Sequence, residues 1–378
     1  MSEIRVNRLS NELNTGGPTL SGITTFSGQQ YFVPPSGSTA ERPSDCPPGS
    51  IRFNTDSAHL EYWDGLQWLE FEATSEELGG GTGSNTGTGH RGLYDGGSTT
   101  PTIGEVIDYI TISTLGNAQD FGNLTYARQA GSHACASSTR ACFGGGYGGS
   151  GYSGANTIDF VTISSTGNAQ DFGDLTVATA TPAAASNSTR GIYYGGGFSP
   201  SPPYTHNVIS YITIASQGVN AQDFGDATTN SAAFSGCASS TRGLFSSGNP
   251  IGIDFLTIST LGNASDFGSL TGVNNHHGAG SNSTRAVFAG GYITNAMAFV
   301  TIATLGNAQD FGDLTVARRY GGGAASSTRI AFGGGATPSA TNVIDYVEVQ
   351  TTGNATDFGD LTVARGLLGA CSNGHGGL

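Results

Sequence analysis

The chain has 378 residues, of which 36% are hydrophobic and only 11% are charged, against roughly 25% charged residues in an ordinary soluble domain. All 14 basic residues are arginines, and 28 acidic residues give a formal net charge of −14. A chain without lysine cannot use P-loop or Schiff-base chemistry, and its negative charge disfavours nucleic acid and anionic membranes as partners. No apolar run approaches the roughly 18 residues of a membrane-spanning helix, so we expect no membrane insertion.

The amino-terminal part divides into three segments before any repeat begins. Residues 1–40 form an anchor segment that we expect to be extended, and residues 41–74 hold alternating runs with turns at Asn54-Thr55-Asp56 and Asp64-Gly65. These runs predict a small three-stranded β meander. About 30 residues cannot bury a stable core alone, so oligomerisation or docking should support this module. Residues 75–90 are a Gly/Ser/Thr linker.

Residues 91–378 consist of six repeats of about 47 residues. The tripeptide Asp-Phe-Gly occurs once in each repeat, and an arginine, usually within Ser-Thr-Arg, keeps step with it. Alternating runs rich in β-branched and aromatic residues, separated by Gly and Asn, predict four short strands per repeat. The repeated positions are Arg91, Arg140, Arg190, Arg242, Arg285 and Arg329, and Asp120, Asp171, Asp223, Asp266, Asp310 and Asp357.

Four strands repeated at this spacing are typical of a β-propeller, so we predict an all-β fold with six blades in residues 91–378. A β-solenoid is the alternative, although its coils are normally shorter and need no closure. The last repeat overruns to Cys371, whose surroundings match those of Cys135 in the second repeat. The C-terminal strand should therefore supply the missing inner strand of the first blade, with residues 368–374 beside 91–96.

The two repeated charged residues should meet on one face of the propeller. In a four-stranded meander, the turn between strands one and two and the turn between strands three and four lie at the same end, and these turns carry Ser-Thr-Arg and Asp-Phe-Gly. We predict that the six aspartates bond to turn backbone or to the six arginines, because the planar arginine fork can bind a carboxylate through two hydrogen bonds. The resulting ring would be structural rather than catalytic.

The opposite face should carry the links between blades and the segments of variable length that follow each double Gly. The longest segments and two of the links contain aromatic residues, histidines and an arginine, which make amphipathic contacts with glycans or proteins. The alternative is that long loops merely need rigid filling. The predicted binding residues are Tyr147, Tyr152, Phe198, Tyr204, His206, His276, His277, Arg319 and Tyr320.

No catalytic or metal site is predicted. Asp-Phe-Gly also marks the magnesium site of protein kinases, but six regularly spaced copies without a lysine exclude that interpretation. The glycine-rich run at 144–149 precedes no helix-forming sequence, and His276-His277 has no third metal ligand nearby. The five cysteines form no CxxC pair, so neither a disulfide framework nor a zinc site is indicated. No serine or cysteine has a recognisable nucleophile context, so we expect no enzyme and no cofactor.

Three features of the sequence resemble known protein families. The repeats are similar to the kelch repeat in spacing and in the double Gly, although the kelch tryptophan is missing and the Phe of Asp-Phe-Gly stands roughly in its place. The opening residues 5–28, the module around residues 49–71, and repeats of the type Gly306-Asn-Ala-Gln-Asp-Phe-Gly-Asp-Leu-Thr-Val-Ala-Arg318 resemble tail-fibre-like virion proteins of tailed phages that infect marine cyanobacteria. This second resemblance spans nearly the whole chain.

The resemblance implies a non-enzymatic virion protein, assembled in the cytoplasm of a bacterial host. It would be a tail fibre or appendage whose propeller adheres to the host surface. Residues 1–74 would contact other virion proteins, the loop face would contact a host glycan or protein, and the chain would form a homo-oligomer, commonly a trimer in phage fibres. The alternatives are a particle-decorating protein and a glycan-degrading depolymerase, although no blade carries a unique pair of carboxylates.

Overall fold

The computed structural model divides the chain into two compact units, Met1–Ser75 and Glu76–Leu378. The residues it describes are 34–57, 59–70, 89–99, 102–129, 134–148, 154–197, 205–230, 232–247, 251–273, 275–292 and 294–378. Most of the anchor segment and most of the linker therefore lie outside the described residues. No helix within the described ranges is long and apolar enough to cross a membrane.

The first unit contains a small sheet of four strands in the order β1-β2-β3-β4. The strands are β1 (Ser36–Gly37), β2 (Ile51–Asn54), β3 (His59–Trp63) and β4 (Trp68–Glu70), with a 3-10 helix at Thr39–Glu41. The predicted meander corresponds to β2, β3 and β4, which pair antiparallel. The short β1, which starts before the predicted boundary at residue 41, pairs parallel with β2 and makes the sheet mixed.

A buried carboxylate stands at the centre of this small sheet. Glu61 on β3 is fully buried, and Arg42 Nη2 lies 2.6 Å from its Oε2 while Arg52 Nε lies 3.4 Å from its Oε1. Burial raises the pKa of Glu61, but the hydrogen bonds from Arg42 and Asn54 and the charge of Arg52 outweigh it and leave the pKa below its ordinary value. The ion pairs of Glu61 with Arg42 and Arg52 thus occupy a position that apolar side chains would fill in a larger domain.

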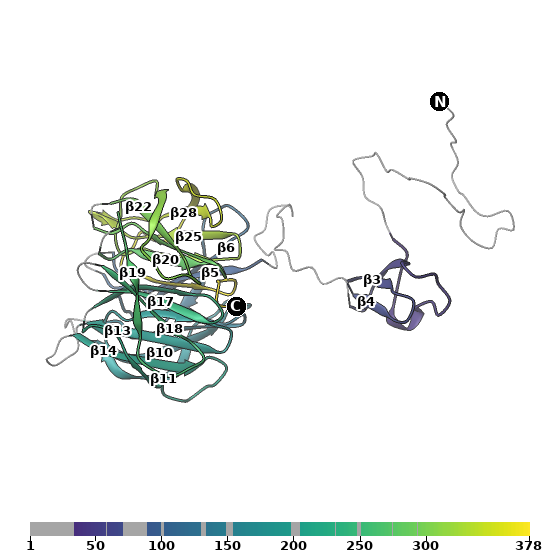
Figure 1. The fold of residues 1–378 in the computed structure, drawn as a ribbon, viewed down its shortest axis with the longest axis horizontal. Coiled ribbons are helices and arrows are strands. Elements are labelled where there is room, and N and C mark those ends of the chain that lie inside the picture. The colour runs from purple at the N-terminus through teal and green to yellow at the C-terminus, as the bar shows by residue number, and fades with distance from the viewer. Residues whose placement is uncertain are drawn as a thin grey trace, which may run out of the picture. The chain divides into compact units, whose positions relative to one another are not determined.

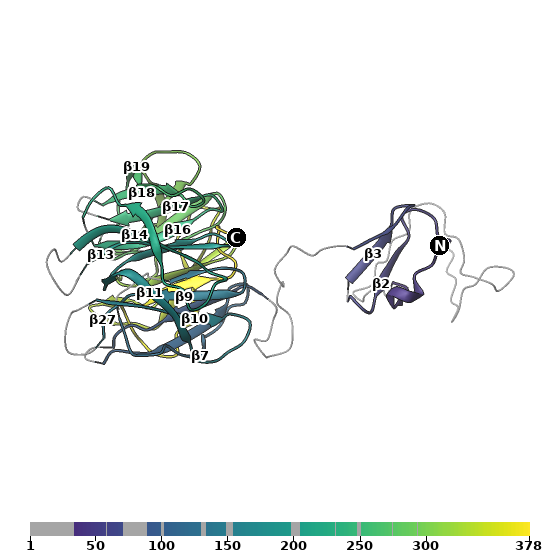
Figure 2. The ribbon, with the colours of Figure 1, turned by 90° about the horizontal axis from the view of Figure 1, so that it is seen from below.

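The second unit is propeller-like, with six four-stranded antiparallel sheets that we call blades 1 to 6 (Figures 1 and 2). Blade 1 contains β30 (Gly369–Ser372), β5 (Arg91–Asp95), β6 (Val106–Thr111) and β7 (Gln119–Asn123); blade 2 contains β8 (Ala134–Ala136), β9 (Arg140–Gly144), β10 (Ala155–Thr162) and β11 (Gln170–Thr179); blade 3 contains β12 (Ala183–Ser186), β13 (Arg190–Gly197), β14 (Thr205–Thr213) and β15 (Gln222–Asp226).

The remaining blades follow the same order from the inner to the outer strand. Blade 4 contains β16 (Ala233–Ala238), β17 (Arg242–Ser247), β18 (Gly252–Thr257) and β19 (Ser265–Ser269); blade 5 contains β20 (Gly278–Ser281), β21 (Arg285–Ala289), β22 (Ala296–Thr301) and β23 (Gln309–Asp313); blade 6 contains β24 (Gly322–Ala325), β25 (Arg329–Gly333), β28 (Val343–Glu348) and β29 (Thr356–Asp360). A two-stranded hairpin, β26 (Ala336–Thr337) and β27 (Ser339–Ala340), lies within the variable segment of blade 6.

The ring is closed by the C-terminal strand, as the sequence predicted. β30 pairs antiparallel with β5, with Cys371 opposite Leu93 and Ala370 opposite Tyr94. The hydrophobic core lies between adjacent blades, where β-branched and aromatic residues of neighbouring middle strands interdigitate. Closure therefore buries both faces of every blade.

Each outer strand is covered by the next blade, which explains the repeated Gly-Asn-Ala-Gln-Asp-Phe-Gly sequence. At the interface of blades 1 and 2, the Gly167 and Ala169 amides donate to the carbonyl oxygens of Phe121 and Asn123, and Asn168 Oδ1 accepts from the Asn123 amide. The same bonds recur at the other five interfaces. Unpaired edge strands invite aggregation, and this arrangement satisfies part of each one.

The glycine of Asp-Phe-Gly is required by this contact. Gly122 has a φ of +146°, and a Cβ on it would overlap the carbonyl group of Gly167 in the next blade. The pairing of β6 with β7 also shifts register between Ile107 and Asp108, which marks a β-bulge at this position. The repeated Asp-Phe-Gly is therefore explained by the contact between blades.

The predicted pairing of the repeated arginines with the Asp-Phe-Gly aspartates is wrong. All six aspartates are exposed. Each arginine instead donates from Nη1 to a backbone carbonyl oxygen of the next blade, at 2.6 to 3.1 Å, and lies over an aromatic ring of its own blade. A carbonyl oxygen satisfies the guanidinium without the cost of removing a second charge from water. Arg329 also pairs with a carboxylate, that of Glu348, whose Oε1 lies 2.7 Å from its Nε.

A different column of aspartates forms the buried ion pairs. Arg128, in the link between blades 1 and 2, places Nη2 3.2 Å from Oδ2 of Asp159 on β10, and Thr125 Oγ1 donates to Oδ1 of Asp159 at 2.8 Å. Arg318 with Asp345 and Arg365 with Asp108 repeat the arrangement. Burial lowers the pKa of Arg318 and of Arg365, whereas the paired aspartates oppose that shift. At three interfaces, these ion pairs thus join the link between two blades to the blade that follows it.

Alternate blades differ at the axis, so the ring has a threefold pattern that the sixfold repeat conceals. Ser186, Ser281 and Ser372 each donate from Oγ to an alanine carbonyl and accept from the same alanine amide on the preceding blade. The asparagine after each serine donates to a serine carbonyl on the following blade. Blades 1, 3 and 5 thus supply side-chain links to both neighbours.

Candidate binding face

The links between blades and the variable segments lie together on one face of the propeller. The link residues Gly366, Gln129 and Arg319 form backbone bridges with Ser98, Tyr147 and Ala336 of the variable segments. The Ser-Thr-Arg and Gly-Asn turns lie at the other ends of the same strands. The prediction that links and variable segments share a face is confirmed at these three positions.

Four side chains form a cluster on this face, which we call the Arg319 cluster: His276, Tyr292, Arg319 and Tyr320. The Arg319 guanidinium carbon lies 4.8 Å from the ring centre of Tyr292 and 4.9 Å from that of Tyr320. The ring of His276 lies 4.5 Å from that of Tyr320. Tyr292 is 48% exposed, and the other three side chains are half-buried. The cluster therefore presents a cation between two aromatic faces.

Backbone bonds fix the cluster from three successive blade interfaces. The Tyr320 amide donates to the His276 carbonyl oxygen at 2.7 Å, and the Leu367 amide donates to the Tyr320 carbonyl oxygen at 3.0 Å. His276, Tyr320 and Leu367 are the described residues other than glycine with positive φ, at 65°, 64° and 57°. Each of the three stands ten residues after the aspartate of its Asp-Phe-Gly, so the positive φ is a feature of the links between these blades.

The histidine of the cluster is neutral at ordinary pH. Burial lowers the pKa of His276 from 6.5 to about 4, and the nearby positive charge of Arg319 acts in the same direction. Arg319 is consequently the fixed charge of this cluster above pH 5.

The other predicted binding residues do not join this cluster. Tyr147 is almost fully buried, with its backbone paired to Gln129. His277 is buried, and its Nε2 lies 2.8 Å from Ser246 Oγ, which is also buried, so the pair is closed to a substrate. His206 is half-buried on β14, and burial lowers its pKa. Tyr152, Phe198 and Tyr204 lie outside the described residues.

Tyr292 was missed by sequence reasoning. It directly follows the Gly290-Gly291 pair, and its amide donates to the Asn275 carbonyl oxygen at 3.0 Å. The available signal was an aromatic residue at the start of a short variable segment, beside two links that already contained His276 and Arg319.

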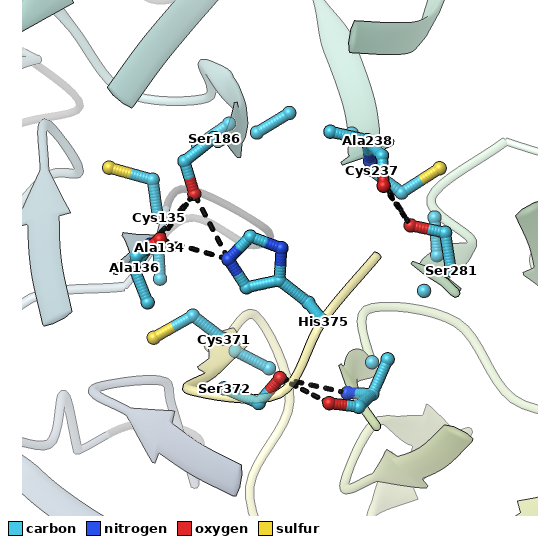
Figure 3. A pocket seen from close by; sticks show the side chains of 18 residues that line it. Ala134, Cys135, Ala136, Ser186, Cys237, Ala238, Ser281, Cys371, Ser372 and His375 are labelled. Atoms are coloured by element: carbon cyan, nitrogen blue, oxygen red, sulfur yellow. Dashed lines mark hydrogen bonds between the residues drawn. The ribbon is translucent and has the colours of Figure 1, made fainter. Parts of the chain in front are cut away.

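The channel at the propeller axis is narrow and is crossed by the C-terminal tail (Figure 3). Alanine, glycine, serine and cysteine residues line it, and the His375 ring points towards Ala136 and Ser186, with Nε2 2.9 Å from the Ala136 carbonyl oxygen. The remaining cavity of about 40 Å³ accommodates a few water molecules but no sugar. The axis therefore has no room for a saccharide.

The cysteines near the axis do not form a metal site. Figure 3 shows the sulfur atoms of Cys135, Cys237 and Cys371 turned away from His375. Cys135 Sγ donates to Tyr193 Oη of blade 3 at 3.5 Å, so it packs between blades. No group of three His, Cys, Asp or Glu residues with metal-binding geometry occurs in the described part of the chain.

Comparisons with known protein families and with curated proteins found no match to this sequence.

Proposed function

We propose that the protein is a non-enzymatic structural component of a bacteriophage virion, with a propeller that adheres to the surface of the host cell. The observation that carries the proposal is the contrast between the two propeller faces. One face repeats the same turns and interface bonds in every blade, whereas the other gathers the variable segments and the Arg319 cluster. A rigid ring with one variable face suits recognition, because loops on a rigid scaffold commonly carry binding residues.

The resemblance of the sequence to tail-fibre-like virion proteins supports the choice of a virion component. In this proposal, residues 1–74 contact other virion proteins, the loop face contacts a host glycan or protein, and the chain works as a homo-oligomer, such as a trimer. The protein is made in the bacterial cytoplasm and ends in the virion, as a fibre, an appendage or a decoration of the particle.

The test is attachment of the purified full-length protein to host cells, measured by fluorescence, together with imaging of virions that carry a labelled copy. Saturable attachment and a label on the particle are the expected results. Attachment without any label on the particle contradicts a virion role, and a labelled particle whose protein does not attach supports decoration instead. Release of reducing sugar from host polysaccharide would establish the depolymerase alternative.

A further inference from the structure

Arg319 differs from every other described arginine in its bonding. The eleven other described arginines each make a side-chain hydrogen bond or ion pair with a carbonyl or carboxylate oxygen. The Arg319 guanidinium has no such acceptor among the described residues, in a chain with 28 acidic residues and 14 arginines. Its contacts are the two tyrosine rings. The two rings therefore hold the guanidinium in place, and its N–H groups can donate hydrogen bonds to an acceptor on a ligand.

Resting on the proposed adhesive function, we propose that the Arg319 cluster binds an acidic saccharide, with Arg319 holding a sugar carboxylate and Tyr292 packing against the sugar ring. A guanidinium presents a planar fork of donors that matches a carboxylate through two parallel hydrogen bonds. The tyrosine ring, with its apolar body and polar tip, suits a ligand that has both apolar and polar faces.

The surrounding structure prepares the cluster for binding. Arg319 is anchored on both sides by backbone bonds with Ala336, whose amide donates to the Arg319 carbonyl oxygen at 2.8 Å. Tyr320 is fixed by its bond to the His276 carbonyl oxygen. Two aromatic contacts restrict the guanidinium before any ligand arrives. A preorganised site loses less side-chain entropy on binding, which favours affinity.

Because the protein has a net charge of −14, general electrostatic attraction cannot bring an acidic glycan to it, and binding requires a specific site. A distant negative field repels an acidic glycan, but at physiological ionic strength it is screened beyond about 8 Å. Recognition of an anion by this protein consequently depends on direct contact with a fixed cation. Arg319 provides that cation on the variable face.

The experiment measures binding of the full-length protein to immobilised uronate polymers by surface plasmon resonance. Polygalacturonate, alginate and hyaluronate supply carboxylates in different stereochemistry, and their carboxyl-reduced forms are the neutral probes. Galactose 6-phosphate serves as a competing probe for phosphate. We expect binding to at least one acidic polymer, none to its reduced form, and a loss of about tenfold or more for Arg319→Gln and several-fold for Tyr292→Ala.

Arg329→Gln is the matched control, because it removes the same charge from a Ser-Thr-Arg turn on the opposite face and should leave polymer binding unchanged. Circular dichroism establishes that each variant is folded. Equal binding to the reduced polymers, undiminished binding by Arg319→Gln, or no binding to any acidic polymer overturns the inference. Free galacturonate is the competing probe for a carboxylate. If galactose 6-phosphate competes more strongly than galacturonate, the ligand group is a phosphate and the proposed carboxylate is rejected.

Attachment to host cells is measured in parallel, so that failure of the acidic-saccharide proposal can be distinguished from failure of the proposed adhesive function. Cell attachment that survives Arg319→Gln rejects the acidic saccharide and leaves adhesion standing. Absence of attachment by the wild-type protein rejects adhesion, whereas the polymer measurements still decide what the cluster binds.

Discussion

The amide of Gly376 donates a hydrogen bond to the carbonyl oxygen of Ser281 at 2.9 Å, which joins the C-terminal tail to blade 5. The tail leaves blade 1, and blade 6 stands between these two blades in the ring. Gly376 fits only because it lacks a side chain, since a Cβ there would overlap the carbonyl group of Asn282. The tail therefore ties together blades that share no interface.

Two truncations should distinguish the contribution of ring closure to stability from that of the bond between the C-terminal tail and blade 5. Deleting the last 12 residues removes β30 with its ladder of bonds to β5, and we expect cooperative unfolding to be lost. Deleting residues 375–378 leaves β30 in place and should only lower the melting temperature. Differential scanning calorimetry of both variants checks the order, and an unchanged melting temperature after the longer deletion refutes closure.

Replacing Asp159 with Ala should destabilise the protein by about 3–5 kcal/mol, because Arg128 would remain buried without its carboxylate. The matched control is Asp120→Ala in the exposed Asp-Phe-Gly column, for which we expect a change within about 0.5 kcal/mol. Urea denaturation followed by circular dichroism measures both. If the two variants lose equal stability, the assignment of the structural aspartates is mistaken.

Gly122→Ala should lower the free energy of unfolding by more than about 1 kcal/mol, because its φ of +146° and the Gly167 carbonyl oxygen both exclude a side chain. Gly353 lies in the Gly-Asn turn that precedes the outer strand of blade 6, and a Cβ added there would have no atom within 4 Å. Gly353→Ala is therefore the control and should be close to neutral. Chemical denaturation of the two variants tests the pair. A neutral Gly122→Ala would show that the interface can shift to admit a methyl group.

Acid should weaken the folded state below about pH 6.5, in part through three histidines. Burial lowers the pKa values of His206, His276 and His375 from 6.5, so on acidification the unfolded chain takes up protons before the folded chain does. The stability that these neutral histidines contribute should therefore be fully present well above pH 6.5 and fall as the pH drops through 6.5, for His276 down to about pH 4. Urea titrations at several pH values measure the slope, and it should be shallower in a His206→Asn, His276→Asn double variant.

Thiol reactivity should divide the cysteines between the two units. Cys46 is half-buried in the first unit, whereas the four propeller cysteines are buried. Burial raises the pKa of Cys237 to about 12 and raises those of Cys142 and Cys371 above their ordinary value, which suppresses the reactive thiolate. Ellman's reagent should modify one thiol rapidly in the native protein and the others only after denaturation. Rapid modification of several thiols would indicate that the blades open readily.

The six-bladed propeller could be predicted from the sequence because its signals are local or periodic. Alternating runs such as Ile107-Asp-Tyr-Ile, the Gly-Asn turns and the spacing of Asp-Phe-Gly specify strands, turns and their number. Closure was also readable, since the surroundings of Cys371 repeat those of Cys135. In these cases a short run of residues, or the comparison of one repeat with another, contains all the information.

The tertiary structure alone decided which residues meet between blades. Two aspartates recur in the repeats, and the sequence does not say that Asp159 is buried beside Arg128 whereas Asp120 faces water. The His375 tail likewise joins blades that no period relates. His276 and Tyr320 stand at the same position of successive repeats, but the repeat does not say that their side chains meet beside Arg319. The physical reason is that a strand pattern reports which side of a sheet is buried, but the partner across an interface depends on the curvature and packing of the closed ring.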